Sequence, residues 1–146
     1  MSSFLGYLFY QIFFAVFILI ITPFLLPLLM IRKYRLFILQ KFGFSLPVLP
    51  GDKTRKRIWI NAVSIGELRA ITPLIRDLRS RAAEAAIFLS IGTLAGMRFS
   101  RNLDLPVDIK FYYPLDLPWV VRHVLKNVKP DIYITAEAEL WPNFIS

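Results

Sequence analysis

The first 31 residues of the chain, Met1–Ile31, contain no charged side chain, and most of them are leucine, isoleucine, phenylalanine or valine. About 20 such residues in a helix suffice to cross the hydrocarbon core of a bilayer. A secretory signal peptide would carry a basic residue before the apolar run and a small-residue cleavage site after it, and this sequence has neither. We therefore predict a membrane anchor. Because Pro23 and Pro27 interrupt its second half, the anchor either spans with a kink or lies within one leaflet.

Basic residues follow the apolar segment directly. Arg32, Lys33, Arg35 and Lys41 occur before the first acidic residue, which is Asp52. Positive charges that flank a membrane segment tend to remain in the cytoplasm, and they also attract anionic headgroups. The pattern predicts a globular part that faces the cytosol and lies against an anionic membrane surface.

The formal net charge of the whole chain is +8, and a second basic cluster consists of Lys53, Arg55, Lys56 and Arg57. Aromatic side chains do not alternate with these bases, as they would in a groove for single-stranded nucleic acid. We interpret the cluster as a contact for acidic headgroups or an anionic lipid substrate, and expect no nucleic-acid partner.

The chain has no cysteine, which excludes disulfides and thiolate metal sites. Nothing in the sequence calls for a metal ion.

Beyond the apolar segment, short apolar runs alternate with helical patterns. Strands are expected at residues 58–63, 86–91, 109–113 and 131–136, and helices at 68–79, at 93–102, from about 118, and after 139. This alternation predicts an α/β fold: a Rossmann-like parallel sheet with helices on both faces. We divide the chain into an anchor with its basic flank (1–43), a linker rich in proline and charge (44–56) and the sheet domain (57–146). Since the last helical pattern has barely begun at Ser146, we expect this domain to be incomplete.

Candidate functional residues follow the first strand. Ser64, Gly66 and Glu67 stand where the strand ends and the next helix begins, which is where open α/β sheets bind ligands. A carboxylate there could accept a proton from a bound hydroxyl. The alternative is a purely structural role, because glutamate is favoured at the positive end of a helix dipole.

A second acidic pair, Glu137 and Glu139, follows the fourth strand. The two side chains would share one face if the strand continued that far, and they would lie at the same carboxyl edge as Glu67. Acids that converge on a crevice can handle the protons of sugar hydroxyls. The alternative is that Glu137 and Glu139 cap the following helix or pair with Arg69 or Arg98.

Three blocks of the sequence resemble those of one family: Trp59-Ile-Asn-Ala-Val-Ser-Ile-Gly-Glu67, Tyr113-Pro-Leu-Asp-Leu-Pro118 and Glu137-Ala-Glu-Leu-Trp-Pro-Asn143. That family is the 3-deoxy-D-manno-octulosonic acid (Kdo) transferases of lipopolysaccharide assembly, and the resemblance extends over residues 1–146. It implies the N-terminal half of an inverting glycosyltransferase with two Rossmann domains (GT-B type). Such an enzyme moves Kdo from CMP-Kdo, its donor substrate, to a glucosamine hydroxyl of a lipid A precursor at the bacterial inner membrane, without a metal or another cofactor.

The resemblance also assigns roles to individual residues. Glu67 matches the proposed general base and Glu137 the acid that stabilises the transition state. Ser64, Gly66, Asn61 and Glu139 are expected to bind the acceptor. The donor is expected to bind in a C-terminal domain that this chain lacks, so the 146 residues alone are expected to be inactive.

The sequence departs from the family pattern at two places. Asn61 stands where the family usually has histidine, and asparagine can form hydrogen bonds but cannot titrate near neutral pH. In the segment Ser90-Ile-Gly-Thr-Leu-Ala-Gly96, only Ser90, Thr93 and Gly96 fit the family's threonine-rich pattern. Two alternatives therefore stay open: a membrane-tethered binding module without catalytic activity, and a transferase for a different nucleotide sugar.

Overall fold

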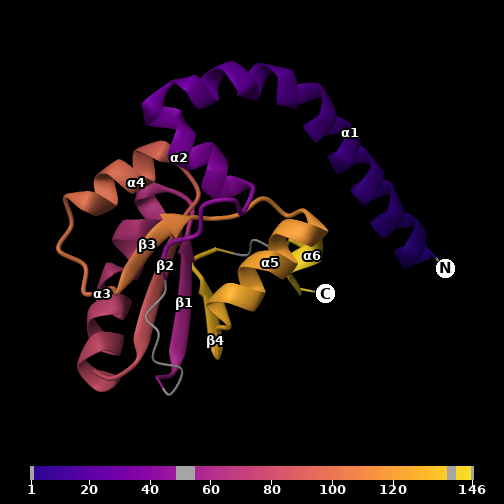
Figure 1. The fold of residues 1–146 in the computed structure, drawn as a ribbon. Helices are drawn as coiled ribbons and strands as arrows, with labels where there is room; N and C mark the ends of the chain where they lie inside the picture. Colours follow the sequence, from indigo (N-terminus) through magenta and orange to yellow (C-terminus); the bar gives the residue numbers. More distant parts are fainter. Residues whose placement is uncertain (1, 49–54, 138–140, 146) are drawn as a thin grey trace.

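A computed structural model describes residues 2–48, 55–137 and 141–145 of the chain. Two helices come first, and four strands then alternate with helices (Figure 1). The elements are α1 (Ser2–Met30), α2 (Arg32–Lys41), β1 (Arg57–Ala62), α3 (Ile65–Arg81), β2 (Ala86–Ile91), α4 (Leu94–Arg101), β3 (Ile109–Tyr112), α5 (Pro118–Val128), β4 (Ile132–Thr135) and α6 (Pro142–Ile145). Six residues of the expected linker, 49–54, lie outside the described ranges.

The four strands form one parallel sheet in the order β3-β2-β1-β4. The predicted fold class is therefore confirmed, and the predicted strands agree with the observed ones to within a residue at each end. In this order the chain moves outward from β1 to β3 and then crosses back to place β4 on the other side of β1. The reversal creates a topological switch point between β1 and β4, the position at which open sheets of this kind bind ligands.

The residues of the central strand β1 alternate between two hydrophobic layers. Ile58 and Ile60 pack with the apolar residues of α3 and α4 on one face of the sheet. Trp59 packs with Phe88 and Phe111 on the other face, which α5 and α6 cover. Figure 1 shows the two helical layers on opposite sides of the strands. Both faces of β1 are thus covered, which is why the sequence of this strand is almost continuously apolar.

The helix after β1 is longer than its apolar periodicity predicts. We expected residues 68–79, but α3 begins at Ile65 because Ser64 caps its first turn, and it ends at Arg81. The helix continues through Pro73, whose ring nitrogen cannot donate the hydrogen bond of a normal helical turn. The early start places Gly66 and Glu67 inside the first turn of α3 rather than in the preceding loop.

Helix α2 packs against the sheet domain. Its residues Ile38 and Gln40 are buried, and Gln40 Oε1 accepts a hydrogen bond from the backbone N–H of Tyr112 at 2.9 Å. The backbone carbonyl of Lys41 accepts another from Leu115 at 2.8 Å. Tyr112 is the last residue of β3, so α2 lies at the carboxyl end of the sheet and brings the apolar helix to that end of the molecule.

Helix α1 is long and apolar enough, by length and composition, to cross a membrane over the 26 residues Leu5–Met30. One stripe of it is nevertheless half-buried, as Phe14, Ile18, Ile21 and Leu25 recur at helical spacing. Phe14 and Ile18 pack against the hydrophobic layer that contains Trp59. The remaining faces expose large apolar side chains, so α1 presents one side to the protein and leaves apolar side chains uncovered on the others.

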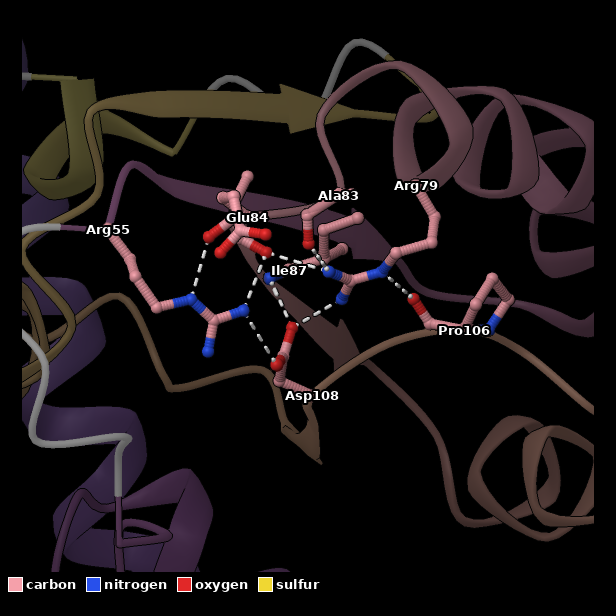
Figure 2. A network of polar contacts seen from close by, with 8 residues as sticks. Arg55, Arg79, Ala83, Glu84, Ile87, Pro106 and Asp108 are labelled. Carbon is pink, nitrogen blue, oxygen red and sulfur yellow. Dashed lines mark hydrogen bonds and ion pairs between the residues drawn. The ribbon is translucent and has the colours of Figure 1, made fainter.

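A polar network at the opposite, amino edge of the sheet joins the end of α3 to the beginnings of β2 and β3 (Figure 2). The carboxylate of Asp108 accepts hydrogen bonds from Arg79 and Arg55 and from the backbone N–H of Ile87, the last at 2.8 Å. Arg79 also donates to the carbonyl of Pro106 at 3.0 Å. Burial by itself would raise the pKa of Asp108, but the Ile87 amide and the two guanidinium groups outweigh it and hold the pKa below the usual value of 3.8.

Asp108 is expected to make the domain sensitive to acid. Because its pKa is lower in the folded state, its contribution is complete above the unfolded pKa and is lost as pH falls through the folded pKa, below about 3.8. Replacing Asp108 with asparagine should reduce the free energy of unfolding at pH 7 by about 1–3 kcal/mol. It should also flatten the loss of stability below pH 4, as measured by denaturant titration at several pH values.

The matched control is Asp77→Asn. Asp77 forms an exposed pair with Arg81 one turn away on α3, and such pairs contribute about 0–1 kcal/mol. Equal effects of the two substitutions would contradict the role given to the Asp108 network.

Candidate functional site at the carboxyl edge of the sheet

The first half of the site is the N-terminus of α3, which forms a capping box. The side chain of Ser64 accepts a hydrogen bond from the backbone N–H of Glu67 at 3.2 Å, and Glu67 Oε1 accepts one from Ser64 N at 3.1 Å. Glu67 Oε2 accepts a third from Val63 N at 2.9 Å. These bonds satisfy amides that the helix leaves unpaired, so the structural role of Glu67 as a helix-start acid is confirmed.

The Glu67 carboxylate is not saturated by these bonds. Glu67 is a buried residue with 9% of its surface exposed, and each carboxylate oxygen accepts one backbone amide. Because a carboxylate oxygen has two lone pairs, each has one left for a further hydrogen bond. Gly66 leaves the helix start uncrowded, because a Cβ placed there would meet only Ser64 Oγ, at 3.7 Å. The carboxylate is fixed in orientation at the positive end of α3.

The second half of the site follows β4. This strand ends at Thr135, so the strand alternation that would have placed Glu137 and Glu139 on one face does not reach them. Glu137 is exposed, and none of the ion pairs among the described residues includes it, so the alternative in which Glu137 pairs with Arg69 or Arg98 is not observed. Glu139 lies outside the described residues, and its assignment stays a prediction.

The sheet topology brings these two halves together. Asn61 on β1 pairs with Thr135 on the adjacent parallel strand β4, and the carbonyl of Asn61 accepts a hydrogen bond from Ala136 N at 3.0 Å. Glu67 and Glu137 therefore follow the carboxyl ends of neighbouring strands, on the two sides of the switch point. Acidic groups in that position can receive a proton from a hydroxyl and stabilise positive charge on a bound ligand.

Asn61 itself lies beneath the edge, with no exposed surface. Its Oδ1 accepts a hydrogen bond from Ser90 Oγ at 2.8 Å, and Ser90 Oγ accepts one from Trp59 Nε1 at 2.8 Å. This buried chain of polar contacts ties the ends of β1 and β2 together. A direct contact between Asn61 and an acceptor stays a prediction, while its support of the two strand ends is observed.

The loop after β2 packs against the loop after β1. Thr93 caps α4 by accepting from Gly96 N at 3.0 Å, and its hydroxyl donates to the carbonyl of Val63 at 3.2 Å. Gly92 makes the approach possible, since a Cβ at this position would lie 2.9 Å from the Cα of Val63. The segment that only partly fits the family pattern thus packs directly against the residues that precede Glu67.

Two polar residues near this edge, Asp116 and Asn143, were not among the predicted site residues. Asp116 together with Pro118 is a typical signal for the start of a helix, and α5 does begin at Pro118, but its N-cap is Leu117 and no side chain caps it. Asp116 Oδ2 instead accepts a hydrogen bond from Asn143 N, 27 residues away, at 3.0 Å. Each is a polar residue within a largely apolar part of a family-like block, which is a signal that could have marked them.

The amino edge of the sheet carries another candidate site. A pocket at the amino edge is lined partly by Arg55, Arg57 and Lys129. Its arginines are already engaged, Arg57 with the carbonyl of Val128 and Arg55 with Asp108. That edge is also the end of a parallel sheet where ligands do not usually bind. Within the described ranges, no three His, Asp or Glu side chains gather closely enough to hold a metal ion.

Comparison with known proteins bears on the family of this chain. Residues 38–146 match the family model described as 3-deoxy-D-manno-octulosonic-acid transferase (kdotransferase). The 3-deoxy-D-manno-octulosonic acid transferase of Haemophilus influenzae is 32% identical over 117 residues, which cover 77% of this chain and 26% of that protein. A probable mitochondrial 3-deoxy-D-manno-octulosonic acid transferase of Arabidopsis thaliana is 34% identical over 107 residues, covering 73% of this chain and 23% of the relative. The chain spans about a quarter of the length of these curated relatives.

Removing the helix cap should weaken the site locally. Ser64→Ala deletes the acceptor for Glu67 N and is expected to lower the free energy of unfolding by about 1 kcal/mol. The control is Ser80→Ala at the other end of α3, where the hydroxyl only donates to the carbonyl of Asp77 three residues earlier. Denaturant titrations of both variants should separate them, and an equal, negligible change would argue against the capping role.

The contact between the two loops predicts a large difference between two glycine substitutions. Gly92→Ala should destabilise the domain by about 1–3 kcal/mol, because the new methyl group overlaps Val63. Gly66→Ala has room for its methyl group and should leave stability unchanged or raise it by up to about 1 kcal/mol, since alanine favours helix. Thermal and denaturant unfolding would test both, and a tolerated Gly92→Ala would mean that the loops are not in contact.

Proposed function

Because this chain belongs to the 3-deoxy-D-manno-octulosonic-acid (Kdo) transferase family, we propose that it is the acceptor-binding part of an inverting Kdo glycosyltransferase of the GT-B type. The donor is CMP-Kdo, and the acceptor is a hydroxyl group of a lipid A precursor. A second Rossmann domain, C-terminal to this segment, binds the donor. No cofactor or metal takes part.

In this proposal Glu67 is the general base. The acceptor hydroxyl oxygen attacks the anomeric carbon of Kdo from the side opposite the leaving CMP. The new carbon–oxygen bond forms as the bond to the phosphate oxygen breaks, and the hydroxyl proton passes to the Glu67 carboxylate. The observation that carries this role is the placement of Glu67 at the switch point, where backbone amides of Val63 and Ser64 fix its orientation. A base with a fixed orientation loses little freedom when the acceptor binds.

Glu137 supplies negative charge from the neighbouring strand. As the bond to CMP breaks, positive charge develops on the sugar ring, and an exposed carboxylate at the end of β4 can stabilise it. Ser64 and Gly66 shape the surface that receives the acceptor hydroxyl, and Asn61 and Glu139 complete the acceptor site. The assignment of Glu139 rests on the family resemblance alone, and those of the other residues also on their places beside the carboxyl ends of β1 and β4.

The apolar helix and its basic flank suggest how the protein lies on a membrane. Helix α1 lacks charge, and the basic residues Arg32, Lys33, Arg35 and Lys41 follow it. Because α2 is joined to the carboxyl end of β3 through Gln40, this helix pair lies at the same end of the sheet as Glu67. We place the protein on the cytoplasmic face of the inner membrane, with its basic residues on anionic headgroups and the lipid acceptor reaching the site from the bilayer.

The test is Glu67→Gln in a protein that joins this segment to a donor-binding domain. Glutamine also occurs at this position of capping boxes, so the fold should persist, but it cannot accept a proton. Transfer of Kdo from CMP-Kdo to the lipid acceptor should fall by about 10²–10⁴-fold in kcat. Glu84→Gln, an exposed acid at the other end of α3, serves as the control and should transfer normally.

Near-normal transfer by the Glu67→Gln protein would remove this residue from the mechanism. Offering the unmodified protein a panel of nucleotide sugars tests the identity of the donor in the same assay. Transfer of another sugar in preference to Kdo would assign a different donor. A folded protein that binds the lipid but transfers no sugar would be a non-catalytic module.

A further inference from the structure

Asp116 and Asn143 form a buried polar pair on the face of the sheet that α5 and α6 cover. They are only 4% and 8% exposed, respectively. Asp116 Oδ2 accepts from the backbone N–H of Asn143 at 3.0 Å and from Asn143 Nδ2 at 3.1 Å. The same Nδ2 donates to the backbone carbonyl of Asp116 at 2.6 Å. The pair therefore links the β3–α5 loop to the beginning of α6.

Helix α1 joins this pair with three of its few polar side chains. The hydroxyl of Tyr10 donates to Asp116 Oδ2 at 2.9 Å, and the hydroxyl of Tyr7 donates to Asn143 Oδ1 at 2.8 Å. Gln11 Nε2 also donates to Asn143 Oδ1. These three residues lie on one face of α1, three and four positions apart. Figure 1 shows the N-terminal part of α1 descending on the side of the molecule that carries α5 and α6.

Packing alone does not explain a carboxylate at this position. A buried carboxylate is costly unless donors surround it, and Asp116 Oδ1 is buried with no hydrogen-bond partner among the described residues. Asp116 does not cap α5 either, since Leu117 is the N-cap. An apolar residue of the same size would fill the space without the cost. We therefore look for the role of this polar pair in the elements that it joins, which are the β3–α5 loop, α6 and α1.

The pair fixes the start of α6. Strand β4 ends at Thr135, and Asn143 of α6 lies six residues beyond Glu137 in the sequence. The ring of Phe144 packs against Trp59 and Tyr133, with centroids 5.1 and 4.6 Å apart. Those contacts seat α6 on the sheet, while the hydrogen bonds to Asp116 fix its position along the β3–α5 loop.

We propose that Asp116 and Asn143 are positioning residues, which hold the start of α6 to the β3–α5 loop and to the apolar helix α1. Through Tyr7 and Tyr10, the docking of α1 and the position of α6 are coupled. The consequence for catalysis rests on the proposed transferase function: a shift of α6 would alter the position of Glu137, six residues before Asn143 in the sequence. The coupling of α1 to α6 does not depend on that function.

The first test compares two substitutions of matched size, Asp116→Leu and Asp116→Asn, in the 146-residue chain in lipid nanodiscs. Leucine removes both side-chain acceptors and keeps only the backbone carbonyl at this position, whereas the asparagine amide can turn so that its oxygen takes the place of Oδ2. Backbone hydrogen exchange at Asn143–Ile145 should accelerate about tenfold or more in the leucine variant and far less in the asparagine variant. Amides of β1 and α3 should be unchanged in both variants, which shows that the domain remains folded.

The second test changes only α1. Tyr7→Phe combined with Tyr10→Phe removes both hydroxyl donors and keeps the rings, so the fold should tolerate it. Exchange at Asn143–Ile145 should again accelerate several-fold. The control, Tyr34→Phe on α2, alters a tyrosine outside the cluster and should have no effect. The proposal is overturned if the Tyr7/Tyr10 variant leaves exchange at α6 unchanged, or if Asp116→Leu and Asp116→Asn behave alike.

The catalytic consequence is read separately in the protein that carries a donor-binding domain. The Tyr7/Tyr10 variant should lower kcat about tenfold and leave KM for the nucleotide sugar unchanged, because the donor binds elsewhere. Normal kcat together with accelerated exchange at α6 would refute the link to Glu137. If the unmodified protein transfers no sugar, the proposed function fails, while accelerated exchange would still support the coupling of α1 to α6.

Discussion

The site depends on the parallel pairing of β1 with a neighbour on each side. Residues of β1 bond to β2 across one edge and to β4 across the other, and both faces of the strand are covered by helices. A strand buried in this way fixes where its carboxyl end emerges, and it fixes the same end of β4 beside it. The positions of Glu67 and Glu137, which are 70 residues apart in the chain, follow from this register.

The carboxylate of Glu67 serves the fold and the proposed chemistry through the same contacts. By accepting two backbone amides it satisfies donors that α3 would otherwise leave unpaired, and in doing so it acquires one orientation. Its structural and catalytic interpretations therefore do not compete. A helix cap at the end of a buried strand holds a carboxylate in a fixed position. The loop that contains Gly92 packs closely against Val63 and so restricts movement of the residues that precede Glu67.

The apolar helix is part of the globular architecture and is more than a tether. Helix α2 bonds to the end of β3, and α1 packs a stripe of side chains against the layer around Trp59. At its N-terminal end, tyrosine hydroxyls reach a buried aspartate and asparagine. Hydrogen bonds of this kind have a defined geometry, whereas apolar contacts alone would let a helix slide along the surface. The polar pair thus fixes the position of α1 along the surface of the domain.

The sequence by itself determined the fold class, the boundaries of the strands to within a residue at each end, and the family. Nearly continuous apolar runs such as Ile58–Val63 and Ala86–Ile91 identify strands buried on both faces, because such strands have no solvent-facing side to fill with polar residues. The sequence also placed Glu67 and Glu137 at one edge, since all parallel strands end on the same side. It predicted the start of α3 three residues late, because apolar periodicity begins only at Leu68 while the cap at Ser64 decides where the helix starts.

What only the tertiary structure decided are the contacts between distant residues. The sequence could not show that Asn61 is covered completely, nor that Asp116 bonds to Asn143 rather than capping α5. It could not show which face of α1 meets the domain either. A helix that is apolar all round has no periodic signal to distinguish one face from another, so the docked stripe is selected by the complementary surface and not by the helix itself.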